Sequence, residues 1–237
     1  MSLTSVLCKV MESIRRDKIT EYMNGQQLVS VDQHGFTDGW SCLTNLLETF
    51  EAWTRLLNEG YGLDVIHLDY HKAFDTVPHC KLITKLSSMG ITGKLLAWLE
   101  DFLSDRKMRV QVNGSFSGWL EAFSGVPQGS VLEPLLFLLY INDLPNWVKA
   151  NIEMFADDTK LWARILCVED SSVLQEDLWR LKAWSDEWLL HFNPKKCKVM
   201  HIGHTHYTEY WWASLHLYSC LVSELTVFWS VRHFLGW

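Results

Sequence analysis

Apolar residues recur along the chain at two spacings, and the change from one to the other separates helices from strands. Leucine and aromatic residues repeat every three to four positions over residues 42–58, which predicts an amphipathic helix. The following segment, 63–68, is short and apolar with two adjacent β-branched residues, which is typical of a buried strand. A weaker helical pattern over 3–14 predicts a short helix near the start of the chain.

Capping and turn residues predict where further helices begin and end. A helix that starts at Pro78 is expected to stop at Gly90, and Thr92 can cap the helix that follows. Ser172 and Gln175 have the spacing of a capping box, so a longer helix is expected to begin there.

Two hairpins are also expected, and their paired segments are 107–112 with 115–122 and 152–155 with 159–163. Asn113 and Gly114 lie between the first pair, and this dipeptide is the strongest short-range signal for a hairpin. An apolar helix near 130–142 and a strand at 198–202 complete the pattern. Alternating helices and strands with two antiparallel hairpins indicate an α+β fold rather than a doubly wound parallel sheet.

The composition is that of a globular protein with an excess of acidic residues. The 237 residues are 48% hydrophobic and 21% charged, which excludes a disordered or collagen-like chain. Lys and Arg number 21 and Asp and Glu number 28, which gives a net charge of −7. Bulk electrostatics therefore do not favour nucleic acid as a partner. Such a role would need local groups, metal ions or basic parts outside this chain.

Cysteines and the first segment of the chain indicate an intracellular protein that is neither secreted nor bound to a membrane. Six cysteines form no CxxC pair, so reduced, buried thiols are expected rather than a disulfide scaffold or a zinc ribbon. The longest apolar stretch, 131–141, is interrupted and too short to span a bilayer. Near the N-terminus the basic residues follow the apolar ones, which is the reverse of a signal peptide.

Three short segments carry residues suited to chemistry. Asp69 follows the apolar strand, residues 124–130 form a turn with two glycines, a proline and an amide, and Asp157 and Asp158 lie side by side at a predicted hairpin tip. Adjacent carboxylates repel each other unless a cation or water screens them. If the strands bring Asp69 alongside, the three carboxylates form an oxygen site suited to Mg²⁺. Two such ions could clamp an in-line phosphoryl displacement.

Each of these features also has an ordinary structural explanation. An Asp-Asp pair is usually only a solvated turn, because Asp favours turns. Asp75 is assigned a structural role, and Trp184 and Trp188 are assigned to the core because they lie at helical spacing. Three histidines suggest zinc but lack matching cysteine or carboxylate ligands: His201, His204 and His206. The three acidic and turn segments together, in this order, are much less probable by chance.

Four segments together resemble the reverse transcriptase domain of non-LTR retrotransposons of the LINE type, especially the jockey-like elements. Motif A of that family corresponds to LDYHKAFDTVPH at 68–79, and motif B corresponds to SGVPQGSVLEPLLFLLYINDLP at 124–145. Motif C corresponds to FADDTKLW at 155–162, and the stretch around motif D to NPKKCKVMHIGH at 193–204. The resemblance runs from about Gln33 to about His206.

The resemblance implies a right-hand polymerase palm with partial fingers and the thumb missing. By it, Asp69, Asp157 and Asp158 would be the metal ligands and would hold two Mg²⁺ ions, with Mn²⁺ as the alternative. Lys196 would lie near the pyrophosphate as a proton donor. The implied reaction is RNA-templated DNA synthesis, in which a primer 3′-hydroxyl attacks the α-phosphate of a deoxynucleoside triphosphate.

The resemblance also implies a set of nucleotide-binding residues. Phe74 would be a steric gate that collides with a ribose 2′-hydroxyl, and Tyr70 would offer its backbone to the triphosphate. Gln128 and Gly129 would shape the nucleotide and template pocket. The expected partners are an RNA template, a DNA primer and deoxynucleoside triphosphates, in the nucleus or the cytoplasm. The oligomeric state is left open.

The chain departs from the family at positions expected to contact phosphate. Where the family usually reads QHGFRKGRS, Thr37, Asp38 and Trp40 replace the basic residues. Each lost charge-assisted contact of about 1.5–3 kcal/mol would weaken nucleotide binding by roughly one to two orders of magnitude. Glu133 replaces the motif B glycine, where a carboxylate would oppose template phosphate, and His71 stands where the family often has Arg.

Three ranges are predicted. Residues 1–32 are a remnant of the fingers or a leader, 33–206 form the reverse transcriptase palm with part of the fingers, and 207–237 form a divergent aromatic tail. The leading hypothesis is a truncated reverse transcriptase fragment from a mobile element. Two alternatives stay open. One is a catalytically inactive relic that at most binds RNA or a partner chain, and the other is a product of a decayed element that does not fold stably, because exposed aromatic patches aggregate.

Overall fold

The computed structural model describes residues 5–203 and 208–222. The chain divides into two compact units, each assembled from segments that are distant in sequence. The unit that we call the helical unit takes in Met1–Ser30, Lys72–Asn142 and Trp188–Leu190. The other, which we call the sheet unit, takes in Val31–His71, Asp143–Glu187 and His191–Trp237.

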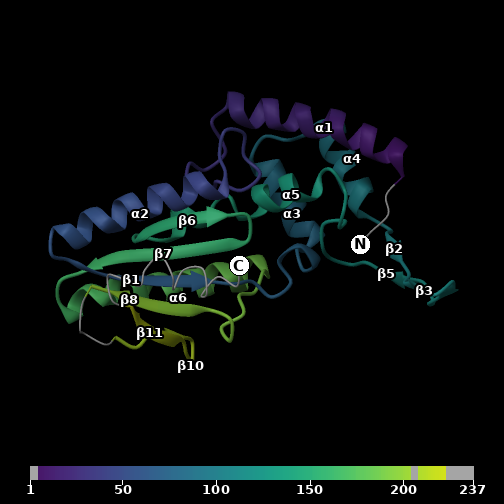
Figure 1. Ribbon diagram of the computed structural model, residues 1–237. Helices are drawn as coiled ribbons and strands as arrows, with labels where there is room; N and C mark the ends of the chain where they lie inside the picture. Colours follow the sequence, from purple (N-terminus) through teal and green to yellow (C-terminus); the bar gives the residue numbers. More distant parts are fainter. Residues whose placement is uncertain (1–4, 204–207, 223–237) are drawn as a thin grey trace. The chain divides into compact units, whose positions relative to one another are not determined.

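The sheet unit is built on a five-stranded sheet with the strand order β11-β8-β1-β7-β6 (Figure 1). Its strands are β1 (Gly62–Leu68), β6 (Asn151–Phe155), β7 (Asp158–Ile165), β8 (Lys198–Ile202) and β11 (Tyr218–Val222). β1 pairs antiparallel with both β7 and β8, β6 pairs antiparallel with β7, and β11 runs parallel to β8. Helices combined with mainly antiparallel strands confirm the prediction of a mixed α+β fold.

One face of this sheet packs against α2 (Cys42–Asn58), the helix predicted at these same residues. Trp53 of the helix is buried in a cluster with Val65, Trp162 and Met200. Val65 is paired with both Trp162 and Met200 across the sheet, and paired residues project to the same face. The core of the sheet unit therefore lies between α2 and the central strands.

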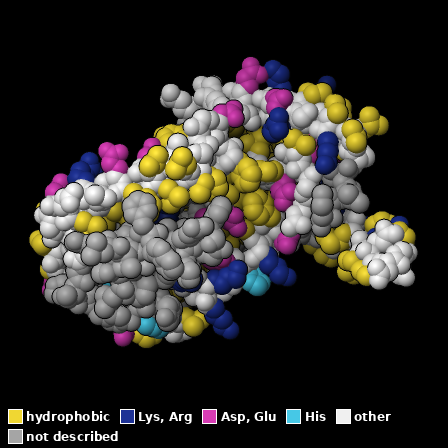
Figure 2. Space-filling model, in the orientation of Figure 1, with side chains coloured by type: hydrophobic (Ala, Val, Ile, Leu, Met, Phe, Trp, Pro, Cys, Tyr) yellow, Lys and Arg dark blue, Asp and Glu magenta, His cyan; other side chains and the backbone are white. Residues whose placement is uncertain are grey.

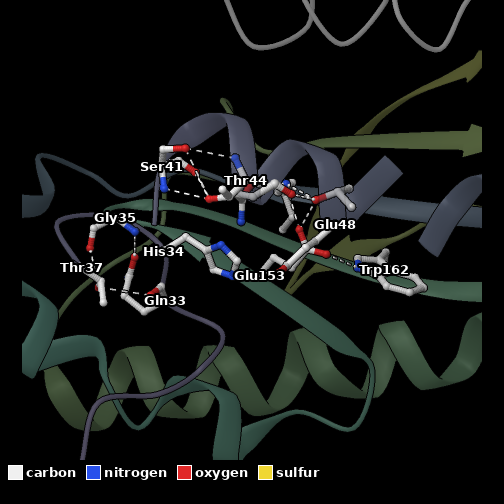
Figure 3. A network of polar contacts seen from close by, with 12 residues as sticks. Gln33, His34, Gly35, Thr37, Ser41, Thr44, Glu48, Glu153 and Trp162 are labelled. Carbon is white, nitrogen blue, oxygen red and sulfur yellow. Dashed lines mark hydrogen bonds and ion pairs between the residues drawn. The ribbon is translucent and has the colours of Figure 1, made fainter. Parts of the chain in front are cut away.

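Helix α6 (Ser171–Trp188) lies on the opposite face of the sheet from α2, as Figures 1 and 3 show. Its buried hydrophobic residues repeat at helical spacing, as the sequence predicted: Leu174, Leu178, Leu181 and Trp184. Asp64 is fully buried and lies 2.5 Å from His201 Nδ1, and it accepts a hydrogen bond of 2.6 Å from the Tyr210 hydroxyl. One carboxylate thus joins β1, β8 and the segment after residue 207.

That segment was predicted to be a divergent tail, and its described part belongs to the sheet unit. It contains β9 (Trp211–Trp212) and β10 (Leu215–His216), which form a hairpin, and then β11. Tyr210, Trp212 and Leu217 are buried. Residues 204–207, with His204 and His206, and residues 223–237 lie outside the described residues.

The helical unit contains α1 (Val6–Gly25), α3 (His79–Ser88), α4 (Gly93–Leu103) and α5 (Glu133–Ile141). α3 contacts both α4 and α5. α1 is anchored by buried Glu12, which accepts a hydrogen bond of 2.6 Å from the Val131 N–H, and by the Tyr22 hydroxyl, which donates to the Met89 carbonyl at 3.1 Å. The helix predicted at 3–14 extends to Gly25 and is longer than expected. The other three helices lie where the sequence predicted them.

A β-ribbon extends the helical unit between α4 and α5. It consists of β2 (Lys107–Met108) paired with β5 (Leu120–Glu121) and of β3 (Gln111–Val112) paired with β4 (Ser115–Phe116). The turn is formed by Asn113 and Gly114, both with positive φ, which confirms the predicted hairpin. Hydrophobic side chains on the ribbon are open to solvent in Figure 2, and the Arg109 guanidinium lies 3.9 Å from the centre of the Phe116 ring.

Three short 3-10 turns complete the described elements, at Ala73–Asp75, Leu144–Trp147 and Val168–Asp170. The capping box predicted at the start of α6 is wrong, because α6 begins at Ser171 and Ser172 lies within it. The Gln175 amide instead bonds the backbone N–H and carbonyl of Trp211, both at 2.9 Å. The Gln175 amide therefore bonds Trp211, which is distant in sequence, and not the start of its own helix.

Five cysteines are free, and most of these are not buried: Cys8, Cys42, Cys80, Cys167 and Cys197. Cys197 is buried as predicted, whereas Cys8, Cys80 and Cys167 are exposed. Over residues 5–203 and 208–222, no helix has the length and apolar character needed to cross a membrane.

Candidate functional site

The ends of two neighbouring strands bring two acidic residues together. Leu68 and Thr159 form the last pair of the β1–β7 ladder, so Asp69 and Asp158 occupy the next position outward on each strand. Opposed residues of antiparallel strands project to the same face. The carboxylates of Asp69 and Asp158 therefore share one side of the sheet at this end of the ladder.

Asp157 lies in the two-residue turn between β6 and β7. Ala156, the first residue of the turn, has a φ of +55°, which is uncommon for a residue with a side chain. The predicted hairpin is confirmed, but its tip is shifted by one residue, because Asp158 is already the first residue of β7. The two adjacent aspartates therefore differ, since one lies in the turn and the other belongs to the strand.

The three carboxylates influence one another's ionisation. Burial raises the pKa of Asp158 above its ordinary value, and the charges of Asp157 and Asp69 raise it further. Burial also raises the pKa of Asp157, with a further contribution from Asp69 and an opposing one from Lys196. Because each ionised group disfavours the next, a cation placed among them would stabilise the charged forms.

Lys196 is the basic group that contacts this cluster. Its Nζ lies 3.3 and 3.4 Å from the two carboxylate oxygens of Asp69. The backbone of Asp69 is held by the loop that carries Lys196, since the Asn193 N–H donates to the Asp69 carbonyl at 2.7 Å. Both charged side chains are exposed, so this ion pair contributes little to stability.

The donor set of this cluster suits a hard divalent cation, since carboxylate oxygens are the ligands that Mg²⁺ prefers. Burial, and after it the neighbouring negative charge, raises the pKa of Asp157 and of Asp158, and a bound cation would favour the charged forms. In the part of the chain that the structure describes, no three histidine, cysteine or acidic side chains are already grouped as a metal site. The chemistry and charge of these residues therefore suit such an ion. In this structure the Lys196 ammonium contacts the Asp69 carboxylate.

A clamp on the acidic turn went unrecognised in the sequence. The buried Gln33 side chain accepts hydrogen bonds from the Ala156 N–H at 2.9 Å and the Gly35 N–H at 2.8 Å, and it donates to the Ala156 carbonyl at 3.3 Å. A Cβ atom at Gly35 would lie 2.2 Å from the Ala156 nitrogen, so only glycine permits this approach. Gln33 and Gly35 (Figure 3) belong to the segment that resembles the family's QHGF motif, and the local sequence gives no sign of this contact.

Tyr70 directly follows Asp69, and its side chain belongs to the core. It is 4% exposed, and its ring stacks on Phe192 with the ring centres 4.3 Å apart. Burial raises the pKa of its hydroxyl well above the ordinary range. The backbone of Tyr70 lies next to the acidic strand end, where the predicted triphosphate contact would be made.

The other predicted nucleotide-binding residues belong to the helical unit. Phe74 is half-buried, with its ring centre 4.4 Å from that of Phe137. Gln128 is exposed, and Gly129 has a φ of +78° that favours glycine. The Val126 N–H donates to the Phe74 carbonyl at 2.8 Å, so the backbone joins the turn that carries Gln128 to the segment that carries Phe74.

Glu133, which replaces the family's glycine, is used inside the same turn. Its carboxylate accepts a hydrogen bond of 2.5 Å from the Gly129 N–H, and its own N–H donates to the Ser130 hydroxyl at 3.0 Å. These two bonds tie the first residue of α5 to the turn that precedes the helix. Burial raises the pKa of Glu133, and its bond to Gly129 opposes that shift.

The residues that replace the expected basic side chains near the start of the sheet unit are used locally. The Thr37 hydroxyl lies within hydrogen-bond distance of the Gln33 and Gly35 carbonyls, at 3.3 and 3.1 Å. Trp40 packs on the His34 ring, with the ring centres 4.2 Å apart. Of the three histidines considered for zinc, His201 lies among the described residues, and it is bonded to Asp64.

Comparisons with known proteins agree with the motifs. The model of the family described as reverse transcriptase (RNA-dependent DNA polymerase) matches residues 1–233, beyond both ends of the range that the motifs predicted. The chain is 31% identical over 205 residues to the probable RNA-directed DNA polymerase from transposon BS of Drosophila melanogaster. It is 30% identical over 206 residues to the RNA-directed DNA polymerase from mobile element jockey of the same species. Each match covers 83% of this chain and 22% of the relative.

Solved structures with a similar fold include two telomerases. Apo telomerase from Candida tropicalis, truncated from its C-terminal domain, has a TM-score of 0.59 at 11% identity and matches 86% of this chain and 43% of its own. Telomerase from Candida albicans, in complex with a fragment of telomeric RNA, has a TM-score of 0.58 at 14% identity and matches 89% and 38%. At these identities the likeness concerns the fold alone.

Proposed function

Because this chain belongs to the reverse transcriptase family, the RNA-dependent DNA polymerases, we propose that it carries the polymerase centre of a mobile-element reverse transcriptase. The observation that supports this most is the juxtaposition of Asp69, Asp157 and Asp158 at one end of the sheet. The chain spans 22% of the length of the curated relatives described above. The polymerase activity of this chain by itself therefore needs a direct test.

The three aspartates are the residues that would hold divalent cations, Mg²⁺ or Mn²⁺. When bound, two such ions supply charge stabilisation for the attacking and leaving oxygens of a phosphoryl transfer. Gln33 holds the Ala156 backbone in the turn that carries Asp157, which supports an orientation of this carboxylate that is fixed before any ligand binds. Such preorganisation is what electrostatic catalysis requires.

Lys196 is suited to a role in proton transfer. Its ammonium contacts Asp69, which keeps the positive charge at the edge of the carboxylate cluster. In the proposed reaction it donates a proton toward the leaving pyrophosphate. Tyr70 presents its backbone to the triphosphate, Phe74 excludes a 2′-hydroxyl, and Gln128 with Gly129 shapes the nucleotide and template pocket.

The two units correspond, in this proposal, to the palm and to part of the fingers. The sheet unit carries the acidic cluster and would be the palm, and the helical unit would contribute the fingers. In this proposal the predicted ranges 1–32, 33–206 and 207–237 are regrouped, because residues 5–30 belong to the same unit as residues 72–142. The substrates would be an RNA template, a DNA primer and deoxynucleoside triphosphates.

The test is primer extension by the purified chain on an RNA template with Mg²⁺ and deoxynucleoside triphosphates. Incorporation that falls at least about a hundredfold in Asp157→Asn would support the assignment. Asp186→Asn is the matched control, since Asp186 is an exposed residue of the same unit whose ion pair with Lys182 lies on α6. Incorporation that survives Asp157→Asn, or a wild-type chain without incorporation at any substrate concentration, would contradict the proposed activity.

A second candidate function is favoured by the replacement of the expected basic residues. Neither tryptophan nor glutamate carries a positive charge for phosphate, and Trp40 packs against His34 while Glu133 is bonded within its turn. An inactive relic would still bind RNA through the remaining basic groups. Filter binding at two salt concentrations tests this candidate, which requires retention that weakens as salt rises. Negligible retention at both would exclude it.

A further inference from the structure

A cavity in the sheet unit lies outside the acidic strand ends. Its volume is about 520 Å³, and it is bordered by the loop around His34 and Trp40, by α2, and by β6 and β7. Three acidic residues line it: Asp32, Glu48 and Glu153. None of them takes part in the polymerase proposal, so the cavity can be considered independently of it.

A buried imidazole in the cavity wall has one nitrogen without a partner. His34 is 3% exposed, and its Nε2 lies 3.5 Å from Glu48 Oε2. Its Nδ1 has no hydrogen-bond partner among the residues that the structure describes. Figure 3 shows the ring directed from its loop toward Glu48 and Glu153. A neutral imidazole that donates through Nε2 presents Nδ1 as an acceptor, so a ligand N–H group would complete its hydrogen bonding.

Two donors near the cavity are already bonded to Glu153. Trp162 Nε1 donates to Glu153 Oε1 at 3.3 Å, and the Lys160 ammonium lies 3.1 Å from Glu153 Oε2. Glu48 adds a further carboxylate to the wall, and no lysine or arginine is among the described residues that line the cavity. The cavity is therefore rich in acceptors, and this chemistry disfavours phosphate and other anions.

Two indole rings form part of the same lining. Trp40 packs on His34 with the ring centres 4.2 Å apart, and Trp162 lies on the β7 side. Tryptophan faces attract cations, and carboxylates accept hydrogen bonds from them. From these observations we propose that the cavity binds a guanidinium or alkylammonium group, supplied by an arginine side chain or by a free polyamine.

Isothermal titration calorimetry of the full chain tests this proposal with matched probes. The cationic probe is acetyl-Gly-Arg-Gly-amide, and the neutral one is the same peptide with citrulline in place of arginine. The expected result is low-millimolar binding of the arginine peptide and at least about tenfold weaker binding of the citrulline peptide. Equal binding of the two peptides, or no binding of either, would overturn the proposal.

Two variants of α2 locate the site. Glu48→Gln removes one carboxylate charge from the cavity and is expected to weaken binding of the arginine peptide by about threefold to tenfold. Glu59→Gln makes the same chemical change at the exposed C-terminal end of the helix, outside the cavity lining, and should leave binding unchanged. Both positions are open to solvent, so both variants should fold. An equal effect of the two variants would show that binding follows net charge and not this cavity, which would overturn the assignment.

Spermidine distinguishes the two sources of the cation. Tighter binding of spermidine than of the arginine peptide assigns a polyamine, and the reverse assigns a protein side chain. Either result supports the cation site, provided that Glu48→Gln weakens it. Trp40→Leu adds a readout of the aromatic wall, because loss of the indole face should weaken both cations without changing the net charge.

Discussion

The ionised Asp158 carboxylate at the acidic strand ends lowers the stability of the folded protein. Burial and the neighbouring Asp157 and Asp69 raise the pKa of Asp158 above the 3.8 expected for an unfolded chain. The folded protein therefore binds this proton more tightly than the unfolded chain does. Stability is lost as the pH rises above about 3.8, and the ionised group is destabilising at neutral pH.

Asp158→Asn should consequently stabilise the protein at pH 7 and leave its stability unchanged at pH 3. Because the side chain is partly solvated, a gain of about 0.5 kcal/mol is expected, or about 1–2 °C in the melting temperature. Thermal unfolding at both pH values measures it. Asp186→Asn, which breaks an exposed ion pair with Lys182, should give no gain, and destabilisation of Asp158→Asn at pH 7 would contradict the argument.

Lys160 shows the opposite case, a buried charge that is fully paired. Its ammonium donates to Asn45 Oδ1 and Thr49 Oγ1, both at 2.9 Å, and pairs with Glu153. Lys160→Met would leave the Glu153 carboxylate buried without its counter-charge, at a cost of about 3–5 kcal/mol. Urea unfolding should show this loss. The double variant with Glu153→Gln should recover part of it, and a double variant as unstable as Lys160→Met would contradict this explanation.

Individual residues of the site were predictable to different degrees. Asp69 could be proposed because it follows an apolar strand, and Asp157 and Asp158 because they are adjacent and flanked by strands. Gln33 could not, since its amide acts on the Ala156 backbone, 123 positions away in the sequence. A local pattern carries no information about such a contact.

Among the elements, the β6–β7 turn depends most on a neighbour. The loop that holds Gly35 approaches the Ala156 backbone so closely that an added Cβ would meet its nitrogen at 2.2 Å. Backbone atoms cannot move aside as a flexible side chain can.

Gly35→Ala should therefore displace the turn that carries Asp157. We expect destabilisation by about 1–3 kcal/mol and at least about a tenfold loss of any primer extension. Gly118→Ala is the control, because a Cβ there meets nothing within 4 Å. Unfolding curves and initial rates on both variants measure the effect. Equal behaviour of the two would show that the turn tolerates the displacement.

Helices and hairpins were largely predictable because their signals are local. α2 begins and ends where its apolar spacing predicted, and the Asn113-Gly114 turn formed the expected ribbon. The start of α6 was not predicted correctly, since Gln175 bonds Trp211 instead of the helix terminus. Pairing of β11 with β8 was also beyond prediction, because strand order depends on contacts between distant segments.

At the scale of the whole molecule, the last described segment is integrated into the sheet unit. The Tyr210 hydroxyl donates to Asp64, and burial raises the pKa of that hydroxyl, so it remains a donor. Tyr210→Phe removes one hydrogen bond to a buried carboxylate and should cost about 1.5–3 kcal/mol in the free energy of unfolding. Chemical denaturation measures this loss. Unchanged stability would mean that the segment is not anchored through Asp64.

The sheet order has a consequence for synthesis on the ribosome. β1 is the central strand, yet its partners β7 and β8 follow it only after about 90 and 130 residues. At roughly 5–20 residues per second, the apolar β1 segment waits roughly five to twenty seconds before β7 has been translated. Until then its edges are unsatisfied and open to the wrong strand. We therefore expect a chaperone to bind the nascent chain early, before β1 can pair with β7 and β8.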